Sequence, residues 1–185
     1  MSQFKIYAID DAPEGSRPVL RTLKEAFGFV PNIAGAIAGS PTLINGFISV
    51  FQNAHAGTFS EAQIQVLLLT NAVTNACNWA VAFHTHLALE QGVSADDVKA
   101  IRDGVAPHDP RHAALSGLAK RLIERRGHVD DARVQAFLDA GFTKEQVLEV
   151  ILVVAASTIT NYVGTVAQPP LEEAFQPHAW KGSVA

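Results

Sequence analysis

The sequence of 185 residues contains one cysteine, Cys77, one methionine and only two tryptophans and two tyrosines. A single cysteine excludes an internal disulfide and any zinc site built on several thiolates, and it suits a reducing compartment. Charged residues are also scarce, at 17%, against about 25% in an average soluble protein. Because 18 acidic residues outnumber 14 basic ones, the chain offers no basic surface to nucleic acid.

The N-terminal segment carries Asp10, Asp11 and Glu14 and lacks the apolar core of a secretory signal. We therefore expect a cytoplasmic protein. The length is sufficient for one domain with a substantial core. We expect a single domain over residues 1–185, with a core motif at 28–92 and C-terminal helices at 109–175.

Two stretches, 62–83 and 150–171, are free of charge and long enough to cross a membrane. Both contain several asparagines, glutamines or threonines, and neither has the basic flanks of a membrane span. We interpret them as buried helices and expect no membrane partner. Covering so much apolar chain is easier when copies associate, so the sequence predicts a homo-oligomer.

The spacing of apolar residues is helical nearly throughout, and no alternating run predicts a strand. Capping residues and glycines mark the ends of the helices. A break is expected at Asn75 or Ala76, because asparagine competes for local backbone hydrogen bonds. The fold class is therefore all-α. The expected helices are 17–27, 41–54, 61–74, 77–91, 95–103, 110–126, 131–140 and 144–167.

The candidate chemistry lies on the expected helix 77–91, where Cys77, Ala80 and His84 follow at i, i+3 and i+7. This spacing places them on one face. Only about 3% of an ordinary thiol is thiolate at pH 7, but a helix N-terminus or an imidazole increases that fraction. The alternatives are that Cys77 is a small buried apolar residue and that His84 is a packed core histidine.

Three segments together resemble a known family: GFVPNIAGAIAGSPTLINGF, FSEAQIQVLLLTNAVTNACNWAVAFHTHLALEQG and DAGFTKEQVLEVILVVAASTITNYV. They are similar to the alkylhydroperoxidase D (AhpD)-like and carboxymuconolactone decarboxylase family, in its peroxidase-related branch. The resemblance implies an all-α fold that assembles into dimers, trimers or hexamers. It also implies an active site on the helix that carries the cysteine motif.

Redox-active relatives in this family carry Cys-x-x-Cys-x-x-x-His, with a glutamate twelve residues before the first cysteine. By this resemblance Cys77 matches the first cysteine and His84 the histidine, whereas Ala80 replaces the second cysteine and Gln65 replaces the glutamate. A glutamine can hydrogen-bond but cannot take up a proton at accessible pH. The dithiol cycle of the family therefore cannot run within one subunit.

Three functions stay open. The first is reduction of a hydroperoxide by Cys77 with His84 and Gln65, recycled by an external thiol reductant. The second is acid–base chemistry by His84 on a lactone or carboxylate, which needs an anion-binding group such as Arg102, Arg111 or Lys120. The third is a non-catalytic relative that binds a small molecule. No motif supports a haem, flavin, nucleotide or metal site, so we expect no cofactor.

Overall fold

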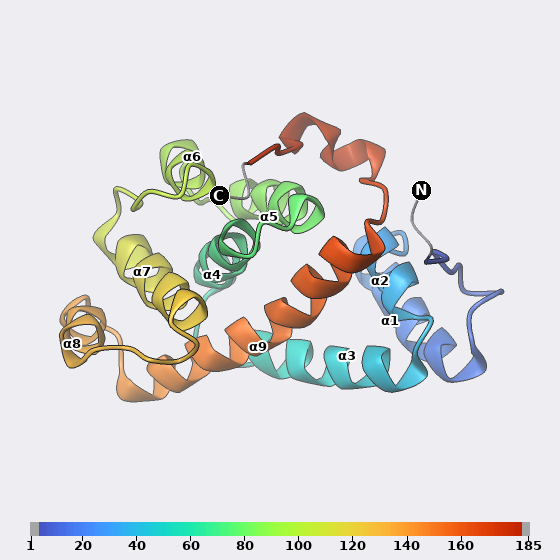
Figure 1. Cartoon of the computed structure of the whole chain (residues 1–185), viewed down its shortest axis with the longest axis horizontal. Helices are drawn as coiled ribbons and strands as arrows, with labels where there is room; N and C mark the ends of the chain where they lie inside the picture. Colours follow the sequence, from blue (N-terminus) through green and yellow to red (C-terminus); the bar gives the residue numbers. More distant parts are fainter. Residues whose placement is uncertain (1–3, 183–185) are drawn as a thin grey trace.

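The computed structural model describes residues 4–182, and this part of the chain is helical without any strand (Figure 1). The sequence-based all-α assignment is therefore confirmed. Short 3-10 helices lie near both ends of the described chain. The elements in chain order are η1 (Glu14–Ser16), α1 (Arg17–Phe27), α2 (Asn32–Ile37), α3 (Pro41–His55), α4 (Glu61–Thr74), α5 (Asn78–Glu90), α6 (Ala95–Arg102), α7 (Pro110–Glu124), α8 (Asp131–Asp139), α9 (Lys144–Ala167) and η2 (Glu173–His178).

Side-chain caps explain where most helices begin. Ser60 and Thr143 each form a capping box. In each box the side-chain oxygen of Gln63 or Gln146 accepts a hydrogen bond from the backbone N–H of the cap residue. Asp109 accepts hydrogen bonds from two backbone N–H groups at the start of α7. The predicted helix starts are confirmed at these positions.

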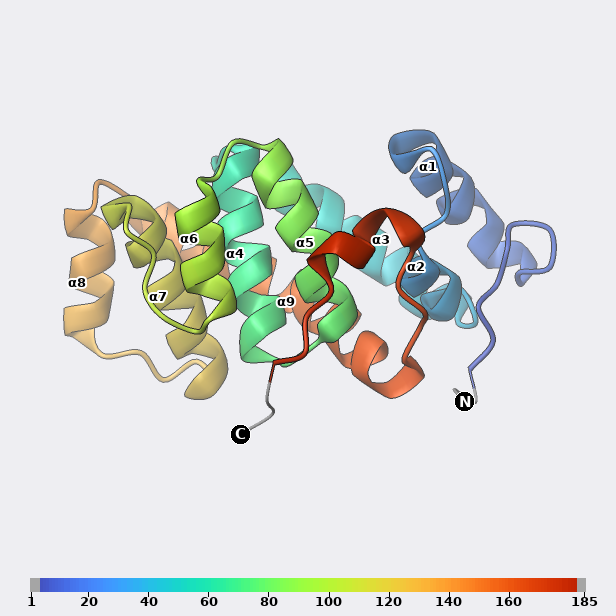
Figure 2. The same cartoon turned by 90° about the horizontal axis from the view of Figure 1, so that it is seen from above.

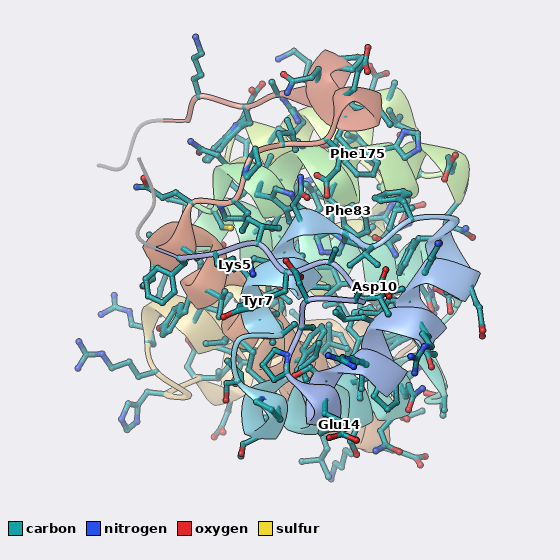
Figure 3. All side chains as sticks on the ribbon, turned by 90° about the vertical axis from the view of Figure 1, so that its right-hand side faces the viewer. Lys5, Tyr7, Asp10, Glu14, Phe83 and Phe175 are labelled. Atoms are coloured by element: carbon teal, nitrogen blue, oxygen red, sulfur yellow. The ribbon has the colours of Figure 1, made fainter. Side chains whose placement is uncertain are left out.

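Besides η1, two short elements were not predicted, α2 and η2. Helix α2 has no side-chain cap and contains a glycine, and η2 contains Pro177, so neither carries an ordinary helix signal. Tertiary contacts hold both. Gly35 of α2 accepts a hydrogen bond from the backbone N–H of Tyr7, and the buried Phe175 of η2 packs on Phe83. Figure 3 shows this C-terminal turn covering the region of Phe83.

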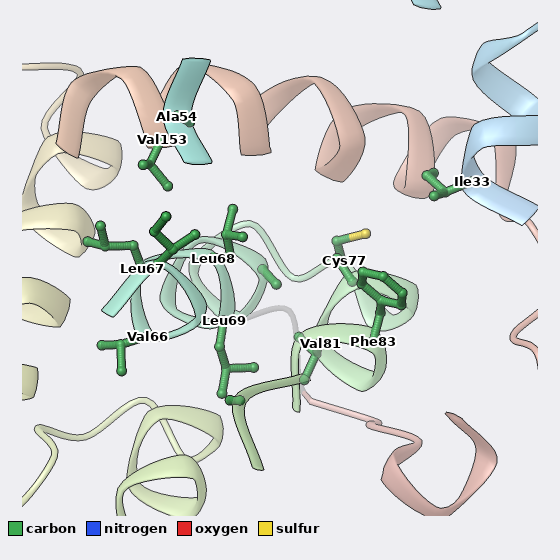
Figure 4. Close-up of a cluster of buried hydrophobic side chains, with 14 of the residues drawn as sticks. Ile33, Ala54, Val66, Leu67, Leu68, Leu69, Cys77, Val81, Phe83 and Val153 are labelled. Carbon is green, nitrogen blue, oxygen red and sulfur yellow. The ribbon is translucent and has the colours of Figure 1, made fainter. Parts of the chain in front are cut away.

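Helix α4 lies at the centre of the fold and contacts α5, α6, α7 and α9 (Figures 1 and 2). Its segment from Ile64 to Ala72 is buried, because apolar side chains point in every direction around the helix. The expectation of a buried helix is confirmed there. Val66, Leu67, Leu68 and Leu69 fill the space between α4 and its neighbours (Figure 4).

Helix α9 is the longest element and crosses α2, α3, α4, α5 and α7. Its length and apolar composition would allow it to cross a membrane, but core helices of soluble proteins have the same properties. Only 39% of its most apolar stretch is buried. The predicted buried helix is thus correct for one face only. Leu148, Ile151, Tyr162 and Val166 are exposed on the other face.

Candidate active site

The break between α4 and α5 positions the cysteine. Helix α4 ends at Thr74, Asn75 follows as its C-cap, and Ala76 adopts a left-handed backbone with φ of 52°. The chain turns there, as predicted, and Cys77 becomes the N-cap residue of α5. It lies one residue outside the helix instead of being its first residue. Cys77 therefore precedes the first turn of α5, whereas His84 lies about two turns further along.

The Cys77 side chain is closed in by two neighbouring helices. Cys77 is 1% exposed, and its Sγ is directed toward Ile33 of α2 (Figure 4). Gly164 of α9 lies so close that a Cβ added to it would stand 2.5 Å from Sγ. The glycine is required here because any larger residue would collide with the sulfur. The thiol packs against the backbone of α9 as a small apolar side chain does.

Burial raises the pKa of the Cys77 thiol above its ordinary value, because the thiolate loses its hydration. The backbone N–H groups of Ala80 and Trp79 act in the opposite direction but are outweighed. The expectation that the helix N-terminus activates this cysteine is therefore wrong. Cys77 is a neutral thiol at physiological pH, because desolvation exceeds the effect of the helix end.

His84 is held by Gln65, the residue that stands in place of the family's glutamate. The side chain of His84 is 5% exposed, and its Nδ1 lies 3.0 Å from Oε1 of Gln65 on α4. An amide oxygen only accepts hydrogen bonds, so Nδ1 carries the proton and donates it. In the neutral imidazole this leaves Nε2 as a hydrogen-bond acceptor.

Burial, together with a smaller contribution from the nearby charge of His55, lowers the pKa of His84 to about 3. The imidazole is therefore neutral throughout the physiological range. A glutamate at position 65 would stabilise the imidazolium, whereas Gln65 does not. His84 is thus a weak base, and its clearest capacity is to accept a hydrogen bond from an O–H or N–H group.

A narrow apolar cavity lies beside His84. Its free volume of about 40 Å³ accommodates about three water molecules. The lining contains five aromatic rings, and its polar side chains among the described residues are His84, Ser157 and Thr160. Cys77 is not part of the lining, whereas Ile33, which lies near Gly164 as the Cys77 sulfur does, belongs to it. The complete lining is Leu23, Phe27, Pro31, Ile33, Ala34, Phe47, Phe51, Leu68, Trp79, Phe83, His84, Ser157 and Thr160.

The three basic residues considered for anion binding are engaged elsewhere. Arg102 donates hydrogen bonds to Oγ1 of Thr85 and to the C-terminal backbone. Arg111 stacks on Phe142, and Lys120 donates to a backbone carbonyl. No charged side chain from residues 4–182 lines the cavity. This removes the anion-binding group that a carboxylate substrate needs.

Glu172 stabilises the cavity wall, and nothing in the sequence singled it out. Its Oε2 accepts a hydrogen bond of 2.8 Å from Nε1 of Trp79, and its Oε1 accepts one of 2.6 Å from the backbone N–H of Asn32. Trp79 in turn stacks on Phe83. Glu172 lies 93 positions after Trp79, so no local signal connects the two.

Glu61 and His55 form a second pair of polar residues near the site. His55 Nδ1 lies 3.0 Å from Oε2 of Glu61. Glu61 lies in the first turn of α4, where a carboxylate also favours the helix dipole. Within residues 4–182 no three His, Cys, Asp or Glu side chains are grouped closely enough to hold a metal ion.

Comparison with known proteins agrees with this architecture. Residues 41–120, which include Gln65, Cys77 and His84, match the carboxymuconolactone decarboxylase family. No curated protein sequence matches the chain.

Three solved structures share the fold. The alkylhydroperoxidase AhpD core of an uncharacterized peroxidase-related protein from Ralstonia eutropha JMP134 has a TM-score of 0.83 at 17% identity, covering 94% of both chains. The debrominase Bmp8 has 0.78 at 17% identity, covering 96% of both. A peroxidase-related protein from Silicibacter sp. TM1040 has 0.74 at 16% identity, covering 94% of both. Residues 41–120 are thus similar to the carboxymuconolactone decarboxylase family, and the chain has the AhpD-like fold along nearly its whole length.

Proposed function

We propose that the protein is a peroxidase-related oxidoreductase that reduces a small, uncharged hydroperoxide with Cys77, aided by His84 and Gln65. The observation that carries the proposal is the neutral imidazole of His84 beside a cavity of about 40 Å³. A molecule the size of hydrogen peroxide fits this volume without displacing side chains. An O–H group in the cavity would donate its hydrogen bond to Nε2 of His84.

In the proposed reaction the Cys77 sulfur attacks one oxygen of the peroxide. A sulfur–oxygen bond forms, the oxygen–oxygen bond breaks, and the thiol proton ends on the departing oxygen as water or an alcohol. The sulfur is oxidised to a sulfenic acid. Two molecules of an external thiol then restore Cys77, releasing water and a disulfide. Gln65 keeps the Nδ1 proton in place, so Nε2 stays free to orient the peroxide.

The buried thiol makes this reaction slow at neutral pH. Little thiolate is present, because burial raises the pKa of Cys77. Cys77 is not among the residues that line the cavity, so the sulfur also needs the packing around it to move before it meets the peroxide. Peroxide consumption should therefore increase steadily from pH 7 to pH 9.5, in contrast to enzymes with an activated cysteine.

The test is peroxide consumption with dithiothreitol as the reductant, comparing the wild type with Cys77→Ala and His84→Leu. Loss of turnover in Cys77→Ala, with a sulfenic acid trapped by dimedone in the wild type, supports the proposal. A thiol that neither traps dimedone nor reacts with a thiol reagent before unfolding contradicts it. Asn53→Ala, on the exposed surface of α3, serves as the control variant.

A second candidate is a reaction or binding event at His84 that does not use Cys77. The specific observation in its favour is that Cys77 is absent from the described lining of the cavity. The fold also supports other chemistry, since one structural neighbour is a debrominase. Because no charged side chain lines the cavity, the ligand would be a small neutral molecule with a hydroxyl group, not a carboxylate. Turnover or binding lost in His84→Leu but kept in Cys77→Ala identifies this case.

The exposed face of α9 supports the homo-oligomer. Leu148, Ile151, Tyr162 and Val166 recur along one side of the helix and are 46–68% exposed. Tyr162 and Val166 also border a groove of about 590 Å³. We propose that a second copy covers this face. Sedimentation velocity should show an oligomer for the wild type and a smaller species for Tyr162→Lys. A monomeric wild type would exclude this assembly.

A further inference from the structure

The His55–Glu61 pair connects solvent to the buried side of the site. The side chain of Glu61 is 48% exposed and that of His55 is 24% exposed, whereas His84 is 5% exposed. His55 Nδ1 contacts both carboxylate oxygens of Glu61, at 3.0 and 3.1 Å. Its other ring nitrogen, Nε2, is buried and has no hydrogen-bond partner among the described residues. A buried polar atom without a partner is uncommon and indicates a specific role.

The pair lies directly behind the cavity wall. The ring of His55 packs on that of Phe51, one turn earlier on α3, with a centroid distance of 4.4 Å, and Phe51 lines the cavity. Glu61 precedes Gln65 by one turn of α4, and Gln65 holds His84. The four polar side chains therefore come from three consecutive helices, and of the four it is His84 that lines the cavity. The charge of His55 also reaches His84, where it opposes protonation.

We propose that His55 and Glu61 form a proton-exchange pair that carries protons between solvent and the His84 cavity. The pair supplies the carboxylate that is missing at Gln65, one helical turn away and with an imidazole in between. This proposal rests on the proposed function in its use, since the Cys77 thiol loses its proton before the attack and the departing oxygen takes one up afterwards, and the pair can hold that proton in between. The pairing itself does not depend on which substrate is turned over.

The transfer uses both nitrogens of His55. The Nε2 lone pair accepts a proton from the cavity side, directly or through one water molecule. The Nδ1 proton then passes to the carboxylate of Glu61, which releases it to solvent. Reversing the order delivers a proton to the cavity. No oxidation or reduction occurs in this sequence. Glu61 returns to its carboxylate, His55 is left neutral with its proton on Nε2, and rotation of the imidazole ring restores the starting tautomer before the next transfer.

Few other titratable groups face His55. Glu61 comes from α4 and His84 from α5. On α9, Glu149 accepts hydrogen bonds of 3.1 Å from the backbone N–H and 2.7 Å from Oγ1 of Thr58. Glu149 is thus committed to the loop that joins α3 and α4. The proton therefore has Glu61 as its exit.

The first experiment uses His55→Phe, which keeps an aromatic ring against Phe51 but removes both nitrogens, and His55→Ala, which leaves space for an added base. Peroxide turnover should fall about tenfold in both variants, with KM unchanged. Imidazole should restore the alanine variant. Pyrrole, which has a similar shape but cannot take up a proton, should not restore it.

Glu61→Gln tests the exit of the route. This variant should flatten the pH dependence of turnover. Its matched control is Glu90→Gln, because Glu90 forms a similar exposed pair with His86 at 3.2 Å on α5, away from the cavity lining. The control should behave as the wild type does.

The second experiment needs no substrate. In NMR spectra of protein labelled at histidine nitrogens, exchange of the His84 Nδ1 proton with water should slow about tenfold in His55→Phe and not in Glu90→Gln. Unchanged exchange, or an alanine variant that imidazole does not restore, contradicts the proton-exchange pair. A wild type without peroxide turnover but with this change in exchange would contradict only the proposed function.

Discussion

Cys77 at the beginning of α5 and His84 two turns later are both buried, but in different surroundings. At the beginning of the helix, Cys77 is enclosed by protein atoms, with Gly164 and Ile33 against its sulfur. Two turns later, His84 is almost as deeply buried but borders a cavity and has a polar partner in Gln65. One group is packed, whereas the other has free space beside it.

Burial alone therefore does not decide whether a group can react with a small molecule. Burial keeps both groups neutral, since it raises the pKa of Cys77 and lowers that of His84. The packed sulfur contributes mainly to stability as it stands, and its chemistry requires the packing to open. The imidazole can meet a small molecule without any rearrangement. Substitutions that alter one end and leave the other unchanged test this distinction.

The largest effect should follow from Gly164→Ala. The new Cβ would stand 2.5 Å from the Cys77 sulfur, so α9 or the cysteine must move. We expect a loss of about 3 kcal/mol in the free energy of unfolding, measured by urea denaturation. The double variant with Cys77→Ala should regain most of this loss, because the collision partner is gone.

Gly46→Ala is the matched control. Gly46 lies within α3, and a Cβ there would meet nothing within 4 Å. This substitution should stabilise the protein by about 0.5–1 kcal/mol. If Gly164→Ala were equally harmless, the Cys77 end would not be tightly packed, and the contrast between the two ends would disappear.

The next effect concerns the pH dependence of stability at the His84 end. Its pKa is 6.5 when unfolded and about 3 when folded, so the unfolded chain binds the extra proton between these values. The stabilisation is complete above pH 6.5 and decreases as the pH falls toward 3. The decrease should be about 1.4 kcal/mol for each pH unit.

Urea denaturation at pH 6.5, 5.5 and 4.5 measures this slope. His84→Leu should reduce this slope by about 1.4 kcal/mol for each pH unit, the contribution of one bound proton. This reduction does not depend on the variant's stability at pH 7. The range above pH 4.5 avoids most of the contribution of Asp97, whose pKa is lowered from 3.8. Equal slopes in the two proteins would mean that His84 is not buried as a neutral imidazole.

Gln65→Glu should have a smaller effect on the same group. A carboxylate 3.0 Å from Nδ1, where the amide oxygen now lies, stabilises the imidazolium. We expect the pKa of His84 to increase by roughly 1 to 3 pH units, measured from histidine NMR chemical shifts. Gln63→Glu, at the capping position of the same helix, should leave this pKa unchanged.

Local signals in the sequence predicted the helices that have caps of their own. Ser60, Thr143 and Asp109 satisfy backbone N–H groups within their own first turns, so a short stretch of sequence contains the complete signal. Helix α2 depends on contacts made elsewhere in the chain and was missed. The break at Asn75 and Ala76 was predictable because asparagine at a helix end is itself a local signal.

The candidate site was only partly predictable for a related reason. The family resemblance singled out Gln65 and His84, and the structure joins them by a hydrogen bond. The direction of the Cys77 sulfur depends on Gly164, which lies 87 residues later in the sequence. The contact of His55 with Glu61 depends on how α3 meets α4. No spacing rule within one helix contains this information.

The smallest effect should come from Glu172→Gln, which perturbs the wall between the two ends of α5. Glu172 accepts hydrogen bonds from Trp79 and from the backbone N–H of Asn32. A glutamine presents an NH₂ group to one of these donors, so one hydrogen bond is lost at a cost of about 1 kcal/mol. Tryptophan fluorescence should report the altered environment of Trp79. Glu173→Gln, an exposed neighbour, should change neither measurement, and an equal effect in both variants would show that Glu172 does not hold the wall. If Glu172→Gln also altered the titration of His84, the cavity would depend on the C-terminal segment as much as on the helices that line it.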